Sequence, residues 1–202
     1  MRVQRFTNAQ VPDALYTKLK YVRGGTFRLD ATYISDFLNT IYINDPNDPD
    51  AILGNRSAQG FDFWRDYYQS YIVTRADIKV EFFNLNDSYP FFVGVLPQYG
   101  PNLAAIVGPS QMNFIMNLPR IRYGVVESRN AGKPKKVIKT SWSIKKDSAF
   151  QNRSNAWEGS SFSASTTTSP GTRRGLQLIV SNISDQNLGV TPRIVTGKQS
   201  PS

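Results

Sequence analysis

The 202-residue sequence contains neither cysteine nor histidine. Without cysteine it can form no disulfide and offers no thiol nucleophile. Without histidine as well it can build neither a Cys/His zinc site nor a catalytic triad that needs an imidazole base. An enzyme made from this chain would have to work with Asp, Glu, Lys, Tyr and Ser alone. These absences exclude most hydrolases and most transition-metal enzymes, and we expect a non-enzymatic protein that uses no cofactor.

Long hydrophobic runs are also missing. No apolar stretch approaches the ~20 residues of a membrane-spanning helix, so we expect no membrane insertion. The first ten residues hold Arg2 and Arg5 but no hydrophobic segment of the kind found in a secretory signal. Charged residues make up only 19% of the chain, whereas aromatic residues reach 12%. This composition is typical of one folded, β-rich domain and not of a disordered tail.

The positive charge is concentrated in the second half of the chain. Residues 1–100 carry 10 basic and 11 acidic side chains, whereas residues 101–202 carry 14 basic and 4 acidic ones. A one-sided basic surface attracts polyanions through counterion release, although a basic surface also keeps a domain soluble. We therefore expect a nucleic-acid partner. The candidate nucleic-acid-binding residues are Arg2, Arg5, Lys18, Lys20, Lys135, Lys136, Lys139, Lys145, Lys146 and Arg153.

Hydrophobic alternation predicts a fold built from strands. Eight segments have strand character: 14–22, 38–43, 71–84, 89–96, 136–144, 157–164, 174–182 and 190–196. In the segment 136–144, for example, Ile138 and Trp142 alternate with Val137 and Lys139. Segment 89–96 is wholly apolar, which indicates a strand buried on both faces. The region 97–127 has no regular pattern apart from a possible helical turn at 111–116.

Eight strands with long, unequal loops predict an all-β fold, an eight-stranded antiparallel jelly-roll sandwich with one or two short helices. An up-and-down barrel should have shorter, more even loops, and an immunoglobulin-like sandwich usually needs only about 100 residues. We expect residues 1–12 to form an N-terminal arm, residues 13–197 the jelly-roll domain and residues 198–202 a tail.

Aromatic residues gather in one short segment with helical spacing. Phe61, Trp64 and Tyr68 recur at intervals of three and four, which predicts a short helix over 61–68 with Gly60 as its N-cap. Such rings can pack into a core, form a subunit contact, or stack on sugars or bases. We assign Phe61, Trp64, Tyr67 and Tyr68 to a subunit interface. A carbohydrate-binding jelly-roll module, with Trp64, Trp142 or Trp157 as a stacking platform, is the alternative.

Acidic residues offer weaker candidate sites. Asp45, Asp48 and Asp50 have the carboxylates of a calcium site but lack the Gly and the closing Glu of a calcium-binding loop, and two neighbouring prolines favour a simple turn. Glu81 with Glu127 or Glu158 could serve as a glycosidase pair. Their spacing in the sequence does not select either pair, because separation in space decides that chemistry.

The order of short motifs resembles the capsid proteins of circular, Rep-encoding single-stranded DNA viruses, the circovirus-like group. The first motifs are Val11-Pro12-Asp13, Leu19-Lys20-Tyr21, Asn39 to Tyr42 and Asp45-Pro46. They are followed by Gly60-Phe61-Asp62-Phe63-Trp64 with Tyr67 and Tyr71, and then by Val73, Ile78, Val80, Phe82 and Asn84. Lys145-Lys146, residues 157–164, Ser169-Pro170 and residues 178–180 follow in the usual C-terminal order. The resemblance covers residues 11–196 and is strongest over 11–84.

This resemblance implies a viral capsid protein, a jelly-roll subunit that self-assembles into a small icosahedral shell around a single-stranded DNA genome. The protein is then expected in the virion, and in the host nucleus during assembly. Coat proteins of this group usually begin with a long Arg-rich arm, whereas only Arg2 and Arg5 precede the first predicted strand here. Either the arm lies outside this chain, or packaging depends on basic residues of the folded domain.

Overall fold

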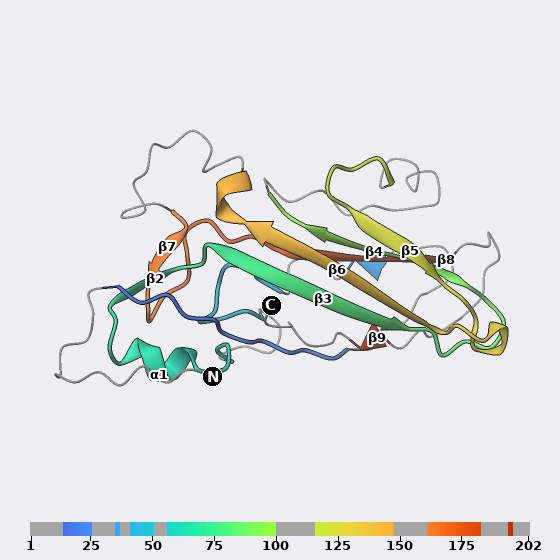
Figure 1. Cartoon of the computed structure of the whole chain (residues 1–202), viewed down its shortest axis with the longest axis horizontal. Coiled ribbons are helices and arrows are strands. Elements are labelled where there is room, and N and C mark those ends of the chain that lie inside the picture. Colours follow the sequence, from blue (N-terminus) through green and yellow to red (C-terminus); the bar gives the residue numbers. More distant parts are fainter. Residues whose placement is uncertain are drawn as a thin grey trace.

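The computed structural model describes residues 14–25, 35–36, 41–50, 56–99, 116–147, 161–182 and 194–195, and strands dominate them. Seven of the nine described strands have three residues or more (Figure 1). The elements are β1 (Ser35–Asp36), α1 (Phe61–Arg65), β2 (Ser70–Ile72), β3 (Arg75–Phe83), β4 (Phe91–Pro97), β5 (Arg122–Val126), the 3-10 helix η2 (Arg129–Ala131), β6 (Lys135–Ser143), the 3-10 helix η3 (Ile144–Lys146), β7 (Ser163–Ser165), β8 (Leu176–Asn182) and β9 (Ile194–Val195). The predicted all-β class with short helices is confirmed.

The strands form three antiparallel sheets, with the orders β1-β8-β4-β5, β6-β3-β9 and β2-β7. Four of the pairings are nested in the sequence: β4 pairs with β5, β3 with β6, β2 with β7, and β1 with β8. Two further pairings, β4 with β8 and β3 with β9, complete the larger sheets. In the sequence, each of the four nested pairs except the outermost, β1 with β8, is therefore enclosed by the two strands of the next pair.

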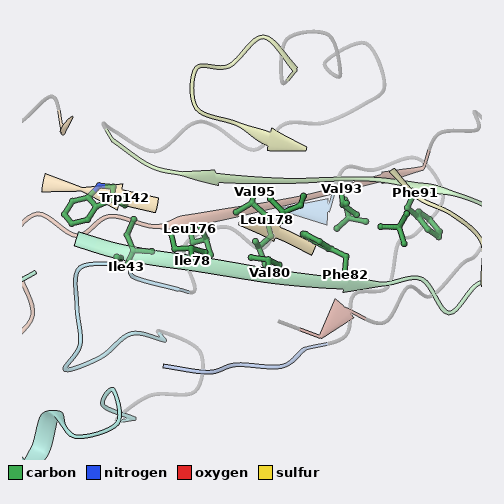
Figure 2. Packing of buried hydrophobic residues seen from close by; sticks show 14 of the residues in the cluster. Ile43, Ile78, Val80, Phe82, Phe91, Val93, Val95, Trp142, Leu176 and Leu178 are labelled. Carbon is green, nitrogen blue, oxygen red and sulfur yellow. The ribbon is translucent and has the colours of Figure 1, made fainter. Parts of the chain in front are cut away.

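The hydrophobic core lies between the two larger sheets. Along β3 the side chains alternate strictly between buried and partly exposed, and Ile78, Val80 and Phe82 point inward. The opposite sheet contributes Phe91, Val93, Val95, Leu176, Leu178 and Val180. Figure 2 shows these side chains packed between β3 on one side and β4 and β8 on the other. Full burial of each such side chain stabilises the fold by about 1.5–3 kcal/mol.

β4 is buried on both faces, as its unbroken apolar sequence predicts. Phe91, Val93 and Val95 join the core, whereas Phe92 lies on the opposite face and stacks on Tyr123 of β5 at a ring-centroid distance of 5.4 Å. Gly94 lies on the same face of β4 as Phe92, and its lack of a side chain leaves room there for Ile121 of the neighbouring segment. This outer apolar layer explains why β4 shows no alternation in the sequence.

Predicted and observed strands agree best where alternation is strong. The segments 71–84, 89–96, 136–144 and 174–182 contain β2 with β3, β4, β6 and β8. The predictions over 157–164 and 190–196 meet β7 and β9 only in part, and residues 38–40, 111–115, 157–160, 190–193 and 196 lie outside the described residues. The domain limits at 12 and 197 also fall outside them.

Of the predicted strand 38–43, the described residues 41–43 form no strand and make only isolated bridges, from Ile41 to Asp50 and from Tyr42 to Gly175. Two further strand predictions were wrong. Residues 14–22 form no strand: the one backbone bridge described there joins Lys20 to Gln59, too little to make a ladder. Conversely, β5 was missed because Arg122 and Tyr123 are exposed and Gly124 interrupts the apolar pattern. The helix predicted over 61–68 is present only over Phe61–Arg65, as α1, and residues 66–67 form a turn. Its N-cap Gly60 has a φ of 87°, a conformation that glycine adopts without strain.

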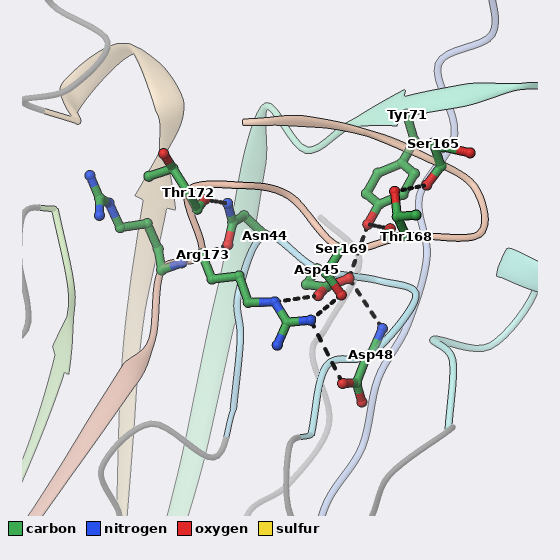
Figure 3. A network of polar contacts seen from close by, with 10 residues as sticks. Asn44, Asp45, Asp48, Tyr71, Ser165, Thr168, Ser169, Thr172 and Arg173 are labelled. Atoms are coloured by element: carbon green, nitrogen blue, oxygen red, sulfur yellow. Dashed lines mark hydrogen bonds and ion pairs between the residues drawn. The ribbon is translucent and has the colours of Figure 1, made fainter. Parts of the chain in front are cut away.

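A buried polar network ties the turn at 44–50 to the loop at 165–174 (Figure 3). The Asp45 carboxylate accepts hydrogen bonds from the Tyr71 hydroxyl at 3.0 Å and the Asp48 amide at 3.1 Å. It also forms an ion pair with Arg173 at 3.1 Å. The third aspartate, Asp50, instead pairs with Arg23 at 2.8 Å. The three carboxylates therefore face two different arginines, which supports the turn interpretation over the calcium site.

Candidate nucleic-acid interface

Three of the predicted lysines lie on β6. Ile138 and Trp142 fill the inner positions of this strand, so Lys135 and Lys139 point away from the core and are exposed. Lys136 lies on the same face of β6 as Ile138 and Trp142. It is exposed because it is near the start of the strand, and its side chain lies over Gly124 of β5. A methyl group at Gly124 would lie only 2.6 Å from Cε of Lys136. A glycine there lets the lysine cross between two sheet edges.

The neighbouring strand β3 adds further charges to the same face. Across the antiparallel pair, Lys79 stands opposite Lys139, and Glu81 stands two residues further along, opposite Val137. The Glu81 carboxylate bonds the ammonium groups of Lys79 at 2.6 Å and Lys135 at 3.1 Å. The hydrogen bond from Lys79, followed by the one from Lys135, lowers the pKa of Glu81 below its ordinary value. Lys135 also lies over the Phe83 ring, 4.9 Å from its centroid.

We call this outward surface the β3–β6 face. Its members are Arg75, Asp77, Lys79, Glu81 and Phe83 of β3, with Lys135, Val137, Lys139, Ser141 and Ser143 of β6. It carries four cations and two carboxylates, and Asp77 is paired with Arg75 at 2.8 Å. Among the described residues, no carboxylate forms a salt bridge with Lys139. The face can therefore bind phosphate groups through positive charge that its own carboxylates do not neutralise.

The remaining predicted lysines lie elsewhere. Lys145 and Lys146 are exposed in η3, at the opposite end of β6 from Lys135, roughly 26 Å along a nine-residue strand. Lys18 and Lys20 belong to the segment beside α1 and line a groove that borders the other side of β3. Arg2, Arg5 and Arg153 lie outside the described residues. The structure thus brings together three of the ten predicted residues and separates four others into two groups.

The predicted interface residues differ in exposure. Tyr67 is 53% exposed, whereas Trp64 and Tyr68 are half-buried. Phe61 is 3% exposed and packs edge-on against Tyr71 at 5.1 Å, so the assignment of Phe61 to a subunit interface needs correction: its ring is used up in packing within the subunit. The prediction overlooked Phe63, which is 56% exposed and contacts the Tyr67 ring at 5.3 Å.

Two other sequence interpretations lose support. Trp142 is completely buried beside Tyr99 and Phe162, so it cannot be a sugar-stacking platform. Glu81 stays ionised between its two lysines, which does not suit the protonated acid of a glycosidase. Glu158 and Trp157 lie outside the described residues.

Lys79, Glu81 and Gly124 belong to the site although sequence reasoning did not select them. Lys79 and Glu81 occupy the polar positions of the alternating segment 71–84, and this pattern placed them on an outward face. Their proximity to Lys135 and Lys139 depends on the pairing of β3 with β6, which the sequence does not reveal.

No family model matches the chain, and neither a curated protein nor a solved structure is significantly similar to it. None of the described helices reaches the length and apolarity that a bilayer-crossing helix requires. The function of the chain must therefore be inferred from its own topology and charge distribution.

Proposed function

We propose that this chain is the subunit of a viral coat, which multiplies into a closed shell around single-stranded DNA. The fold proposed for it is an eight-stranded jelly roll. In that fold a long antiparallel hairpin is wound up so that its strand pairs nest inside one another and alternate between two facing sheets. The nested pairs β1–β8, β3–β6 and β4–β5, and the sheet orders β1-β8-β4-β5 and β6-β3-β9, follow this scheme.

A rigid sandwich suits repeated assembly, because contacts between identical subunits close into a shell only if each subunit keeps one shape. The packed core and the buried Arg174–Asp147 ion pair, with N–O distances of 2.7 and 2.8 Å, give that rigidity. The exposed rings of α1, Phe63 and Tyr67, offer apolar surface for a subunit contact. Trp64 and Tyr68 contribute only their accessible edges.

The observation that carries the proposal is the β3–β6 face, where cations outnumber carboxylates two to one. A face of this kind binds the phosphates of any sequence, and binding releases condensed counterions. In the proposed shell it is turned inward, toward the genome. From the resemblance to circovirus-like coat proteins, we expect the virion to assemble in the host nucleus.

The size of the purified protein with and without single-stranded DNA tests this proposal. Sedimentation and electron microscopy should show uniform closed particles at low salt, and the bound DNA should dissociate as salt is raised. The variant compared with the wild-type protein is K135Q/K136Q/K139Q. It leaves the core untouched and should bind DNA more weakly. A monomer under all these conditions would contradict the coat function. A carbohydrate-binding module would instead bind glycans regardless of salt.

A further inference from the structure

A large groove lies on the other side of β3 from β6. Its volume is about 850 Å³, within the range of natural ligand sites. Segment 14–25, α1 and the start of β3 border it, and in Figure 1 the first two lie together below β3 while β6 lies above. Its deep wall is apolar and includes the core residues Ile43, Ile78 and Leu176. The groove therefore extends beyond the β3–β6 face but shares Arg75 and Asp77 with it.

Residues 61–68, which comprise α1 and the turn after it, present two different sets of rings. Trp64 and Tyr68, one helical turn apart, line the groove and are half-buried, with ring centroids 6.3 Å from each other. Phe63 and Tyr67 do not line it and are more than half exposed. The short segment 61–68 thus turns one aromatic pair toward the groove and another toward the outside.

The groove also has cations on its border. Four cationic side chains line it, Lys18, Lys20, Arg65 and Arg75, against two carboxylates, Asp45 and Asp77. Both carboxylates are already neutralised by arginines: Asp45 by Arg173 at 3.1 Å and Asp77 by Arg75 at 2.8 Å. Within the described part of the chain, Lys20 forms no salt bridge. Arg65 lies 3.3 Å from the exposed carboxylate of Asp62. An occupant of this groove meets an apolar wall, flat rings and border cations, of which Arg65 and Arg75 already have carboxylate partners.

We propose that this groove is a nucleobase-binding site, in which a base of single-stranded nucleic acid stacks on Trp64 and Tyr68 while Lys20 and Arg65 contact the adjoining phosphates. Rings next to cations are the general means by which proteins hold single strands without reading sequence. A surface that bound only phosphates would not need the rings of Trp64 and Tyr68, and a purely apolar contact would not need Lys20. The site deepens the proposed function: it rests on nucleic acid as the partner and adds contacts to bases, where the β3–β6 face contacts phosphates alone.

The test compares a short oligodeoxythymidylate with an abasic oligomer of the same length and charge, at one low salt concentration. The wild-type protein should bind the thymidylate about tenfold more tightly, and binding should quench tryptophan fluorescence. Trp64→Leu keeps an apolar side chain of useful bulk but removes the flat ring, so both the preference and the quenching should disappear. Lys20→Gln should weaken binding of both oligomers.

Tyr123→Leu is the matched control, because it removes an exposed ring of β5 that does not line the groove. It should leave the preference for bases and the quenching unchanged. Circular dichroism and thermal melting establish that each variant is folded. Equal affinity of wild-type protein for the two oligomers, or an unchanged preference in Trp64→Leu, would overturn the base site. Salt-sensitive binding to the β3–β6 face and particle formation would survive that result, so failure of this site is distinguishable from failure of the coat function.

Discussion

Lys79 on β3 and Lys139 on β6 stand directly opposite each other across an antiparallel strand pair. Like charges in this position destabilise a sheet, by up to about 1 kcal/mol. Glu81 relieves part of the repulsion through its 2.6 Å contact with Lys79. An arrangement that costs stability and leaves Lys139 without a described salt-bridge partner makes sense if a polyanion supplies the missing negative charge.

Replacement of Lys139 by Glu should therefore act in opposite directions on stability and binding. The new carboxylate would face Lys79 and turn a repulsive pair into an attractive one, raising the free energy of unfolding by about 0.5 kcal/mol. It should also weaken binding to single-stranded DNA, since the β3–β6 face loses one cation and gains an anion. Urea unfolding and a DNA titration measure the two effects.

Lys146→Glu makes the same charge change at the far end of β6 and is the control for total charge. It should weaken DNA binding less than Lys139→Glu. A loss of stability in Lys139→Glu would contradict the repulsion between Lys79 and Lys139. Equal weakening of binding by the two variants would show that the β3–β6 face is not the site.

Removal of the Glu81 carboxylate should strengthen binding. In Glu81→Gln, Lys79 and Lys135 lose the anion that they share, so two cations become available to phosphates. Each additional contact with a single strand should steepen the plot of log affinity against log salt by about 0.7. Asp87→Asn, in a turn away from this face, removes one charge with a partner at 3.9 Å and should leave the slope unchanged.

Glu81 also gives the face a dependence on acid. Its pKa is lowered in the folded protein, so its ion pairs stabilise the fold above the ordinary carboxyl pKa, and this contribution is lost as the pH falls through the folded value. Acid unfolding of wild-type protein and Glu81→Gln should therefore converge at low pH. If the difference between them grew as the pH fell, the assigned ion pairs would be wrong.

Buried tyrosines predict a loss of stability in alkali. Burial, followed by the Asp50 carboxylate, raises the pKa of Tyr21 to about 12, and burial beside Asp45 raises the pKa of Tyr71 as well. Between the ordinary tyrosine pKa of 10.0 and these higher values the unfolded chain loses protons that the folded chain keeps, so stability should fall as the pH rises. Tyr21→Phe should flatten that fall, which denaturant unfolding between about pH 9 and 12 would measure. An unchanged slope would contradict the contact with Asp50.

The Arg174–Asp147 pair should be the most sensitive polar contact. Both side chains are buried and bonded through two atoms each. Asp147→Asn leaves the arginine charge buried without its counter-ion, so the free energy of unfolding should drop by about 3 kcal/mol. Asp77→Asn, which removes an exposed carboxylate from its pair with Arg75 at 2.8 Å, should cost less. Equal losses in the two variants would show that burial of Arg174 has no special weight.

Alternation in the sequence predicted β3, β6 and β8 because each has one apolar and one polar face or a clear apolar centre. β5 could not be found this way: Arg122 and Tyr123 are exposed, and Gly124, beneath the Lys136 side chain, interrupts the apolar pattern. Residues 14–22 alternate just as clearly but pair only through Lys20, which shows that periodicity reports burial on one side and not ladder formation.

The site was predictable only along single strands. Lys135, Lys136 and Lys139 lie together because they are neighbours on β6. Glu81 and Lys79 reach them from more than 50 residues away through the strand register, and no local pattern encodes that register. The sorting of the α1 rings into groove-lining and outward pairs likewise depends on where segment 14–25 crosses the helix.

Nuclease protection tests the central claim most directly. Single-stranded DNA should be assembled with wild-type protein and with K135Q/K136Q/K139Q, treated with nuclease, and the surviving DNA measured. A coat with the β3–β6 face turned inward should protect the DNA in wild-type particles, and the triple variant should protect far less. Complete digestion of the DNA with wild-type protein, or equal protection by the two proteins, would contradict the coat function.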